Sequence, residues 1–310
     1  MGKIEVGVIG VGHMGRKHVH LLSDMKESFH LCGVYDLDEK LVRSMGYTGK
    51  IFQSEDELMS NVDAVVIAAP SFLHKQLVLK AAEHNLHVLV EKPLSLSAKD
   101  AAEVCERYKA LDHKVLMVGH VERFNPVVLE LEKILGNEDI IAVAMERCSP
   151  MDMHISDTDV IYDLMIHDMD ILLHAIFPSL PLHKVHAFGR TSYNEKNFDY
   201  VQAIFQFENK AQASIISSRA TEDRIRRINV HCKEAYIECD LMHKAITISR
   251  NTHHQKVFVP DVEPLEAELS CFASSIAAGK ALQNSGELAQ KDLEVLDEIR
   301  NLVYGRSSSI

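Results

Sequence analysis

A glycine-rich turn, set between a strand pattern and a helix pattern, constrains the fold of this chain more than any other feature. Gly10, Gly12 and Gly15 stand in G-x-G-x-x-G spacing. Alternating apolar residues before the turn predict a strand, and helically spaced leucines follow it. The first glycine permits the tight turn, and the second lets the backbone approach a pyrophosphate. The third allows helix and strand to pack closely.

A second predicted strand ends at Asp36, which stands about twenty residues beyond the turn, where dinucleotide-binding units carry an acid. A carboxylate there can hydrogen-bond both ribose hydroxyls and would repel a 2′-phosphate. The helix that starts with His13 and Met14 offers free N–H groups and its positive dipole end to the phosphates. The sequence therefore predicts a dinucleotide site that binds NAD rather than NADP.

Strand and helix patterns alternate over the first 120 residues. The nearly continuous apolar run over 62–69 is typical of a strand covered on both faces, as in a parallel sheet. Ser97 and Asp100 form a predicted capping box at the start of a helix. Six parallel strands are expected in a doubly wound α/β sheet. Besides the strands on either side of the first helix, these are 51–52, 62–69, 87–90 and 115–118.

The second half reads as an α+β domain with a large, mainly antiparallel open sheet. Helices are expected at 159–176, 262–279 and 286–303, and Glu208–Lys210 reads as a hairpin turn. The expected strands are 139–147, 183–190, 199–207, 211–219, 225–232, 235–240, 245–250 and 256–259. The predicted division is a dinucleotide-binding Rossmann domain over 1–120 and a substrate-binding and oligomerisation domain over 121–310.

Composition excludes some classes of function. The net charge of −12 argues against nucleic acid as a partner, because binding to phosphate backbones needs a positive surface. The six cysteines include no C-x-x-C pair, so neither a zinc knuckle nor a redox motif is indicated. A strand pattern from the start of the chain leaves no room for a signal peptide, and no apolar run has membrane-spanning length. The expected location is the cytoplasm, with no membrane partner.

Glu91, Lys92 and Pro93 follow a predicted parallel strand, at the sheet edge where doubly wound folds bind ligands. A lysine there can hydrogen-bond a substrate hydroxyl and stabilise a developing alkoxide. A surface lysine after a strand is the alternative interpretation.

Asp163 and His167 stand four residues apart on a predicted helix. A carboxylate beside an imidazole orients the ring and favours its charged form, which suits a general base. Asp170 and His174 continue the same stripe, so a metal site and an ordinary polar helix face are alternatives.

The segment 120–126 opens the second domain and carries Arg123, a natural clamp for a phosphate or a substrate oxygen. An interdomain salt bridge is the alternative for this arginine. Arg224, Arg226 and Arg227 are expected on a solvated or interface strand face. His18 is expected at the surface.

Together these motifs resemble the glucose-fructose oxidoreductase / inositol dehydrogenase / MocA-like oxidoreductases. The resemblance rests on the glycine turn, Asp36, Pro70-Ser71 with His74, Glu91-Lys92-Pro93 and the Asp163–His167 pair. It implies that Pro70, Ser71, His74, Glu91 and Lys92 lie at the cofactor and that Lys92, Asp163 and His167 are catalytic. It also implies a homodimer or homotetramer formed through the open sheet.

A closer resemblance is to the UDP-N-acetylglucosamine 3-dehydrogenases, through the segments 118–126, 146–147 and 159–170. It implies NAD-dependent oxidation of the sugar 3-hydroxyl to a 3-keto sugar nucleotide. Arg123, Asn125 and Arg147 would then hold the substrate, and a downstream aminotransferase is an expected partner. No metal is expected, because no cysteine or clustered third-histidine motif accompanies the helix stripe. A dehydrogenase of another sugar or polyol, such as inositol, and a non-catalytic NAD or sugar-nucleotide sensor are the alternatives.

Overall fold

The computed structural model describes residues 2–136, 138–151, 159–192 and 197–306, and these form two compact units. The first unit comprises Met1–Val121 with Leu265–Leu293, and the second comprises Glu122–Pro264 with Glu294–Ile310. Helix α9 (Gly286–Arg306) begins in the first unit and ends in the second.

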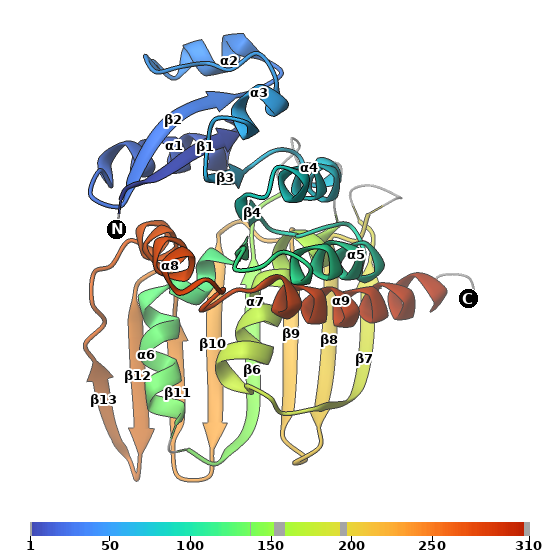
Figure 1. The fold of residues 1–310 in the computed structure, drawn as a ribbon. Helices are drawn as coiled ribbons and strands as arrows, with labels where there is room; N and C mark the ends of the chain where they lie inside the picture. Colours follow the sequence, from blue (N-terminus) through green and yellow to red (C-terminus); the bar gives the residue numbers. More distant parts are fainter. Residues whose placement is uncertain (1, 137, 152–158, 193–196, 307–310) are drawn as a thin grey trace. The chain divides into compact units, whose positions relative to one another are not determined.

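The first unit is built on a parallel sheet with strand order β2-β1-β3-β4-β5 (Figure 1). The strands are β1 Ile4–Ile9, β2 Phe29–Tyr35, β3 Ala64–Ile67, β4 His87–Glu91 and β5 Leu116–Gly119. The helices are α1 His13–Asp24, α2 Glu39–Ser44, α3 Glu55–Met59, α4 Ser71–Glu83, α5 Ala98–Lys109 and α8 Pro264–Ala278. All four residues of β3 are buried, because helices cover both faces of this sheet. The predicted doubly wound fold is confirmed.

The prediction of six parallel strands is wrong by one, because residues 51–52 do not form a strand. Ile51 makes only an isolated parallel bridge with Val34, at the free edge of β2. Ser54, whose side chain accepts a hydrogen bond from the Glu57 N–H, begins α3 three residues later. Because the cap at Ser54 follows so closely, the segment between α2 and α3 has too few residues left to form a strand.

The division at residue 120 also needs one correction, since residues 265–293 belong with the first unit. Ser285 forms an antiparallel bridge with Met117 of β5, and the Val118 N–H donates to the Asn284 carbonyl oxygen. Gly286 packs so closely that a Cβ there would lie 2.5 Å from Leu116. This returning segment therefore covers the open edge of the parallel sheet.

The second unit is built on an eight-stranded sheet with order β13-β12-β11-β10-β6-β9-β8-β7 (Figure 1). The strands are β6 Ile140–Cys148, β7 Leu182–Arg190, β8 Tyr200–Phe207, β9 Gln212–Ser218, β10 Ile225–Cys232, β11 Tyr236–Asp240, β12 Ala245–Arg250 and β13 His253–Val257. The β6–β9 pair is parallel and the other strand pairs are antiparallel. Each strand overlaps a predicted one, although β13 begins three residues before the predicted 256–259 and ends two residues before its end.

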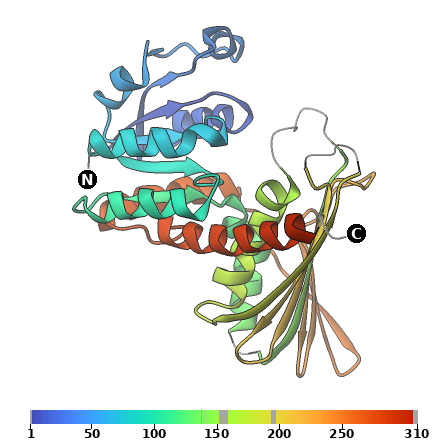
Figure 2. The ribbon, with the colours of Figure 1, turned by 90° about the vertical axis from the view of Figure 1, so that its right-hand side faces the viewer.

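The two faces of this sheet have different chemistry because side chains alternate along every strand. One continuous row of the buried face consists of Val185, Phe205, Ala213, Val143, Val230 and Ile237. Figure 2 shows α6 (Pro126–Leu135) and α7 (Ile166–Ile171) on this face of the sheet. On the opposite face the described part of the chain places no helix.

The helix predicted over 159–176 is not a regular α-helix. Two π-helical segments, Ile161–Met165 and Leu172–Ile176, flank the single α-helical stretch α7. Such wide turns change the angular spacing of side chains and often occur at functional sites. The sequence patterns did not predict α2 or α6. No helix among the described residues is long and apolar enough to cross a membrane.

His87 provides a test of the first sheet. Its Nδ1 accepts a hydrogen bond from the Val115 N–H, and burial lowers the pKa of His87 from 6.5 to about 4. The folded state therefore keeps a neutral ring at pH values where the unfolded state binds a proton. This contribution to stability is lost as pH falls from 6.5 toward about 4. Replacing His87 with Asn, which keeps an acceptor but cannot titrate, should reduce the acid sensitivity of the urea midpoint between about pH 7.5 and about pH 5. Equal acid sensitivity of the two proteins would contradict this role.

Candidate functional site

The glycine turn holds the end of β1 and the start of α1 in close contact. Gly10 has a φ of +86°, and a Cβ there would lie 2.6 Å from the Ala68 carbonyl oxygen. A Cβ on Gly15 would lie only 1.9 Å from the Gly10 carbonyl oxygen. At Gly12, by contrast, an added Cβ would meet nothing within 4 Å. The turn is thus packed tightly at its back, and it is open in front of the N-terminus of α1.

Asp36 lies at the end of β2 and is joined to the glycine turn. Its Oδ2 accepts a hydrogen bond of 2.7 Å from the Val11 N–H, and its Oδ1 accepts one of 2.9 Å from the Asp38 N–H. The carboxylate is only partly buried. Its orientation is therefore fixed by the backbone, and each oxygen keeps capacity for a further hydrogen bond.

A pocket of about 510 Å³ lies at the carboxyl ends of β1, β2 and β3, where doubly wound sheets bind ligands. Its volume is within the usual range for small-molecule sites. Leu37 and Phe72 contribute exposed apolar surface, with 84% and 65% of their areas accessible. The pocket therefore combines the open glycine turn and a fixed carboxylate with apolar walls, which suits a nucleoside attached to phosphates. Gly10, Gly12, Asp36, Leu37, Pro70 and Phe72 are among its lining residues.

The segment Pro70–His74 begins α4 and is anchored by a buried imidazole. Nδ1 of His74 lies 2.7 Å from the Pro93 carbonyl oxygen, and its Nε2 lies 2.8 Å from that of Ala69. Burial lowers the pKa of His74, although both carbonyl oxygens favour its charged form. His74 therefore links the loops that follow β3 and β4. Both of its ring nitrogens face the backbone, so it supports the predicted cofactor site rather than lining it with a polar atom.

Glu91 connects the end of β4 to the cofactor helix. Its Oε1 lies 2.8 Å from Nε2 of His18 on α1, and both side chains are buried. The expectation that His18 lies at the surface is therefore wrong, because its position on α1 faces the sheet. Lys92, the next residue, is partly exposed at the same strand end. The His18–Glu91 contact thus fixes the backbone that precedes the lysine.

In the second unit, Asp163 has a partner that the motif analysis did not identify. Its Oδ2 forms an ion pair of 2.8 Å with Nη2 of Arg219, which is 2% exposed and directly follows β9. The signal was present in the sequence, since Arg219 continues the inward-facing alternation of Ala213, Ile215 and Ser217. Asp163 lies in the first π-helical segment and His167 lies in α7. The assumed α-helical spacing of four residues therefore does not describe their geometry.

Arg147 has a different environment from the substrate-facing one that the resemblance implies. Its Nε and Nη2 donate to Oδ1 of Asp168 at 3.0 and 2.8 Å, and its Nη1 donates to Glu122 at 3.2 Å. The side chain is 3% exposed, so carboxylates satisfy all three nitrogens inside the unit. Burial opposes the charge of Arg147, but Asp168 and Glu122 raise its pKa, so the guanidinium remains charged. Arg147 lies on the inward face because it continues the alternation of Val143 and Met145 along β6, as Arg219 does after β9.

Arg123 and Asn125 are also held by neighbouring side chains. Nη1 of Arg123 lies 3.4 Å from Oδ1 of Asp170. The Asn125 amide donates to Oε2 of Glu122, and its oxygen accepts from the Val127 N–H at the start of α6. Both residues are at most 9% exposed. Asn125 is therefore a helix cap in this structure, and Arg123 is a largely buried ion-pair partner.

The buried ion pairs of Arg147, Glu122 and Asp168 extend to the partly exposed Arg226. Glu122 Oε1 also accepts a hydrogen bond of 2.7 Å from Nη1 of Arg226, whose side chain is 36% exposed. The two arginines around it hold the pKa of Glu122 below its usual value despite burial. Arg226 faces Arg147 across the β10–β6 pair, so it belongs to the inner face rather than to the solvated or interface strand face predicted for it.

The four polar residues of the helix stripe do not form a metal site by themselves in the part of the chain that is described. Asp163, His167, Asp170 and His174 do not bring three ligating atoms together there. Asp163 forms an ion pair with Arg219, and one oxygen of Asp170 forms an ion pair with Arg123. The two aspartates of this stripe balance the charges of the buried Arg219 and Arg123.

Two models of one protein family match the chain. The model described as oxidoreductase family, NAD-binding Rossmann fold, matches residues 4–120, and the model of the GFO/IDH/MocA C-terminal domain matches residues 151–238. Together they cover about two thirds of the sequence.

Individual relatives are similar to the chain to different extents. UDP-N-acetylglucosamine 3-dehydrogenase from Acidithiobacillus ferrooxidans is 28% identical over 96% of both chains. A solved structure of that enzyme superposes with a TM-score of 0.90, covering 98% of this chain and 99% of the other. Inositol 2-dehydrogenase 1 from Paenarthrobacter aurescens is 32% identical, but over 54% of this chain and 53% of its own length.

The two kinds of glycine in the turn should respond differently to substitution. In Gly15→Ala the new methyl group would overlap the Gly10 carbonyl oxygen, so we expect a loss of about 1–3 kcal/mol in unfolding free energy. Gly12→Ala should leave stability within about 0.5 kcal/mol, because its methyl group enters open space. That space is the one a pyrophosphate would need, so NAD should bind Gly12→Ala at least about tenfold more weakly. Calorimetric binding and urea unfolding measure the two effects, and an unchanged NAD affinity in Gly12→Ala would contradict the assignment.

Proposed function

The chain belongs to the GFO/IDH/MocA family of NAD-binding oxidoreductases, and from this membership we propose that it oxidises a sugar nucleotide. The proposed substrate is UDP-N-acetylglucosamine, whose 3-hydroxyl becomes a 3-keto group. The observation that carries this proposal is the end-to-end likeness to a UDP-N-acetylglucosamine 3-dehydrogenase in both sequence and fold. The inositol dehydrogenase relative, in contrast, aligns over only about half of the chain.

The residues of the first unit fit an NAD molecule. The open space before Gly12 can accept a pyrophosphate at the N-terminus of α1, where N–H groups and the helix dipole favour negative charge. Asp36, held by the Val11 and Asp38 N–H groups, presents a carboxylate for the ribose hydroxyls. A 2′-phosphate there would meet this carboxylate, which supports NAD over NADP. Leu37 and Phe72 offer apolar surface for the adenine.

We assign the chemistry to three residues. NAD, when bound, accepts the hydride of the carbinol carbon. His167 takes the proton of the substrate hydroxyl as general base. Lys92 hydrogen-bonds the same oxygen and stabilises its developing negative charge. Asp163 favours the charged form of the imidazole, and its carboxylate forms an ion pair of 2.8 Å with Arg219.

The three residues proposed to hold the sugar nucleotide now have distinct roles. Arg123 remains the candidate for direct contact, because the one carboxylate paired with its guanidinium among the described residues lies at a long 3.4 Å. Asn125 and Arg147 are fully engaged within the protein, so we propose that they act by holding Glu122 and Asp168 in place.

The proposed reaction is tested by NADH formation with a panel of UDP-N-acetylglucosamine, UDP-glucose, inositol and glucose. An aminotransferase with glutamate should be present to remove the keto product, because oxidation of the sugar is uphill. We expect NADH with UDP-N-acetylglucosamine alone. Turnover of inositol or glucose instead would replace the substrate assignment, while an inactive protein that still binds NAD would favour the sensor alternative.

The same assay includes variants that separate chemistry from binding. We expect His167→Asn and Lys92→Ala to lower kcat by about 10²- to 10⁴-fold. NAD affinity should be retained in His167→Asn. Lys99→Ala, which removes an exposed lysine from α5, is the matched control and should keep full activity. Full turnover by either of the first two variants would remove that residue from the mechanism.

We also propose that two copies of the chain associate through the outer face of the eight-stranded sheet. The outer row of the register includes Ile204 beside Ser214 and Ala144, which are small or apolar rather than charged. Ile204 and Phe188 are 42% and 57% exposed on this face. A broad sheet of such composition is suited to burial against a copy of itself.

Ile204→Glu should therefore convert the oligomer to a monomer, because association would bury an unpaired carboxylate. Light scattering coupled to gel filtration measures the mass. Lys210→Glu, an equivalent acidic change at the β8–β9 turn, should leave the oligomer intact. A monomeric wild-type protein, or an Ile204→Glu protein of unchanged mass, would contradict this interface.

A further inference from the structure

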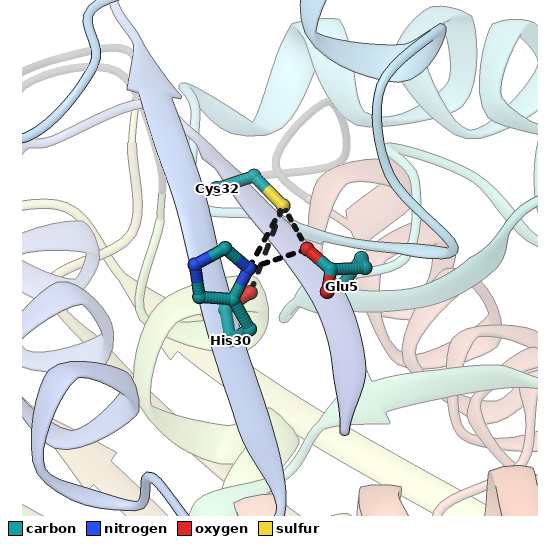
Figure 3. A group of neighbouring side chains, drawn as sticks. All are labelled: Glu5, His30 and Cys32. Carbon is teal, nitrogen blue, oxygen red and sulfur yellow. Dashed lines mark hydrogen bonds and ion pairs between the residues drawn. The ribbon is translucent and has the colours of Figure 1, made fainter. Parts of the chain in front are cut away.

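Three side chains with metal-binding chemistry converge at the amino-terminal ends of β1 and β2. Glu5 of β1 is the register partner of His30 of β2. The register shifts between Val6 and Gly7, so that Cys32 is the extra residue of a bulge. Bulges redirect side chains, and Figure 3 shows Cys32 and His30 both pointing toward the Glu5 carboxylate. No sequence motif indicates this cluster, because Glu5 stands far from the other two residues along the chain.

The ligating atoms of the three residues form a compact triangle. Oε2 of Glu5 lies 2.5 Å from Nδ1 of His30 and 2.8 Å from Sγ of Cys32, and Sγ lies 3.8 Å from Nδ1. All three atoms lie within 4.8 Å of one another. Zinc bonds of about 2.0–2.3 Å in tetrahedral geometry place donor atoms about 3–4 Å apart. The sulfur and nitrogen already have this separation, and the Glu5 oxygen, at 2.5 and 2.8 Å, would have to move outward to reach it.

The surroundings of the cluster allow a cation to enter and favour its charge. The side chains of His30 and Glu5 are 61% and 45% exposed, so they can adjust around an ion that arrives from solvent. Asp63 adds a second carboxylate, whose Oδ2 lies 3.4 Å from the Glu5 backbone nitrogen. No lysine or arginine is paired with the three cluster residues among the contacts of the described chain.

The surroundings of the Cys32 thiol do not suit a reactive cysteine. The Cys32 sulfur lies 2.8 Å from Oε2 of Glu5 and donates its hydrogen to that carboxylate. A protonated thiol is a poor nucleophile, and the neighbouring carboxylate works against thiolate formation. A divalent cation reverses this balance, because it replaces the protons that now lie between the three groups and is neutralised by one carboxylate and one thiolate.

We propose that Glu5, His30 and Cys32 form a zinc site with three protein ligands and a water molecule in the fourth position. Thiolate, imidazole and carboxylate together suit Zn²⁺ better than Mg²⁺ or Ca²⁺, which prefer oxygen ligands alone. The ion would cross-link β1 to β2 at the ends opposite those that carry the glycine turn and Asp36. It would therefore stabilise the first unit without touching the NAD pocket, and it is independent of the proposed reaction.

The direct test uses the full-length protein, freed of metal with a chelator and titrated with Co²⁺ and with Zn²⁺. We expect one equivalent of Co²⁺ to give a thiolate-to-cobalt charge-transfer band, which Zn²⁺ then displaces. Cys32→Ser should abolish the band and weaken Zn²⁺ binding at least about tenfold. Cys271→Ser, which changes another partly exposed thiol that contacts Ser275, is the matched control and should bind as the wild type does.

Absence of the band in the wild-type protein, or its survival in Cys32→Ser, would overturn the site. A second measurement covers the case in which Cys32→Ser does not fold. His30→Gln keeps the thiol but loses the imidazole ligand, and it should also weaken Zn²⁺ binding at least about tenfold. Saturating Zn²⁺ should raise the Tm of the wild type but not of His30→Gln, with NAD affinity unchanged in both. Equal Zn²⁺ affinity in His30→Gln and the wild type would count against the proposal.

Discussion

The contact between the backbone of the glycine turn and the first turn of α1 is the constraint on which the cofactor-binding unit depends. The hydrogen atom of Gly15 occupies a position where a methyl carbon would lie 1.9 Å from a carbonyl oxygen. This close approach places the helix N-terminus directly behind the open space at Gly12. Asp36 is then fixed by the Val11 N–H of the same turn. The phosphate side and the ribose side of the pocket are therefore set by one piece of backbone geometry, and His18–Glu91 extends it to the strand before Lys92.

The second unit depends on a different constraint, which is the neutralisation of arginines on the inner face of its sheet. Arg147 and Arg219 are at most 2% exposed, and an unpaired charge at such depth would cost several kcal/mol. Asp168 and Asp163, both from the irregular helix, supply the opposite charges. The helix that carries the proposed base is thereby held on the sheet by ion pairs as well as by apolar packing. Asp163 and Asp168 therefore stabilise the fold, in addition to any role in catalysis.

The sequence predicted most of the architecture because hydrophobic alternation survives in each element. All eight strands of the second sheet overlap segments predicted from this pattern, whereas the glycine turn and the Ser97 cap of α5 were predicted from short motifs. A strand was wrongly predicted at residues 51–52, because strand propensity does not reveal that the Ser54 helix cap follows only two residues later. The placement of 265–293 was missed because pairing of Asn284–Ser285 with β5 is a contact between segments far apart in the chain. The π-helical turns were missed because no local pattern distinguishes them from an α-helix.

The sequence by itself determined the family, most of the order of strands and helices, and the residue types available for chemistry, since these follow from local spacing and short motifs. Only the tertiary structure decided which charged groups meet. It paired Asp163 with Arg219, enclosed Arg147 between Glu122 and Asp168, and turned His74 toward two carbonyl oxygens. It also brought Glu5 to His30 and Cys32 through strand register and a bulge. Such contacts join residues far apart in the chain, and their energies depend on burial, which no single segment of sequence specifies.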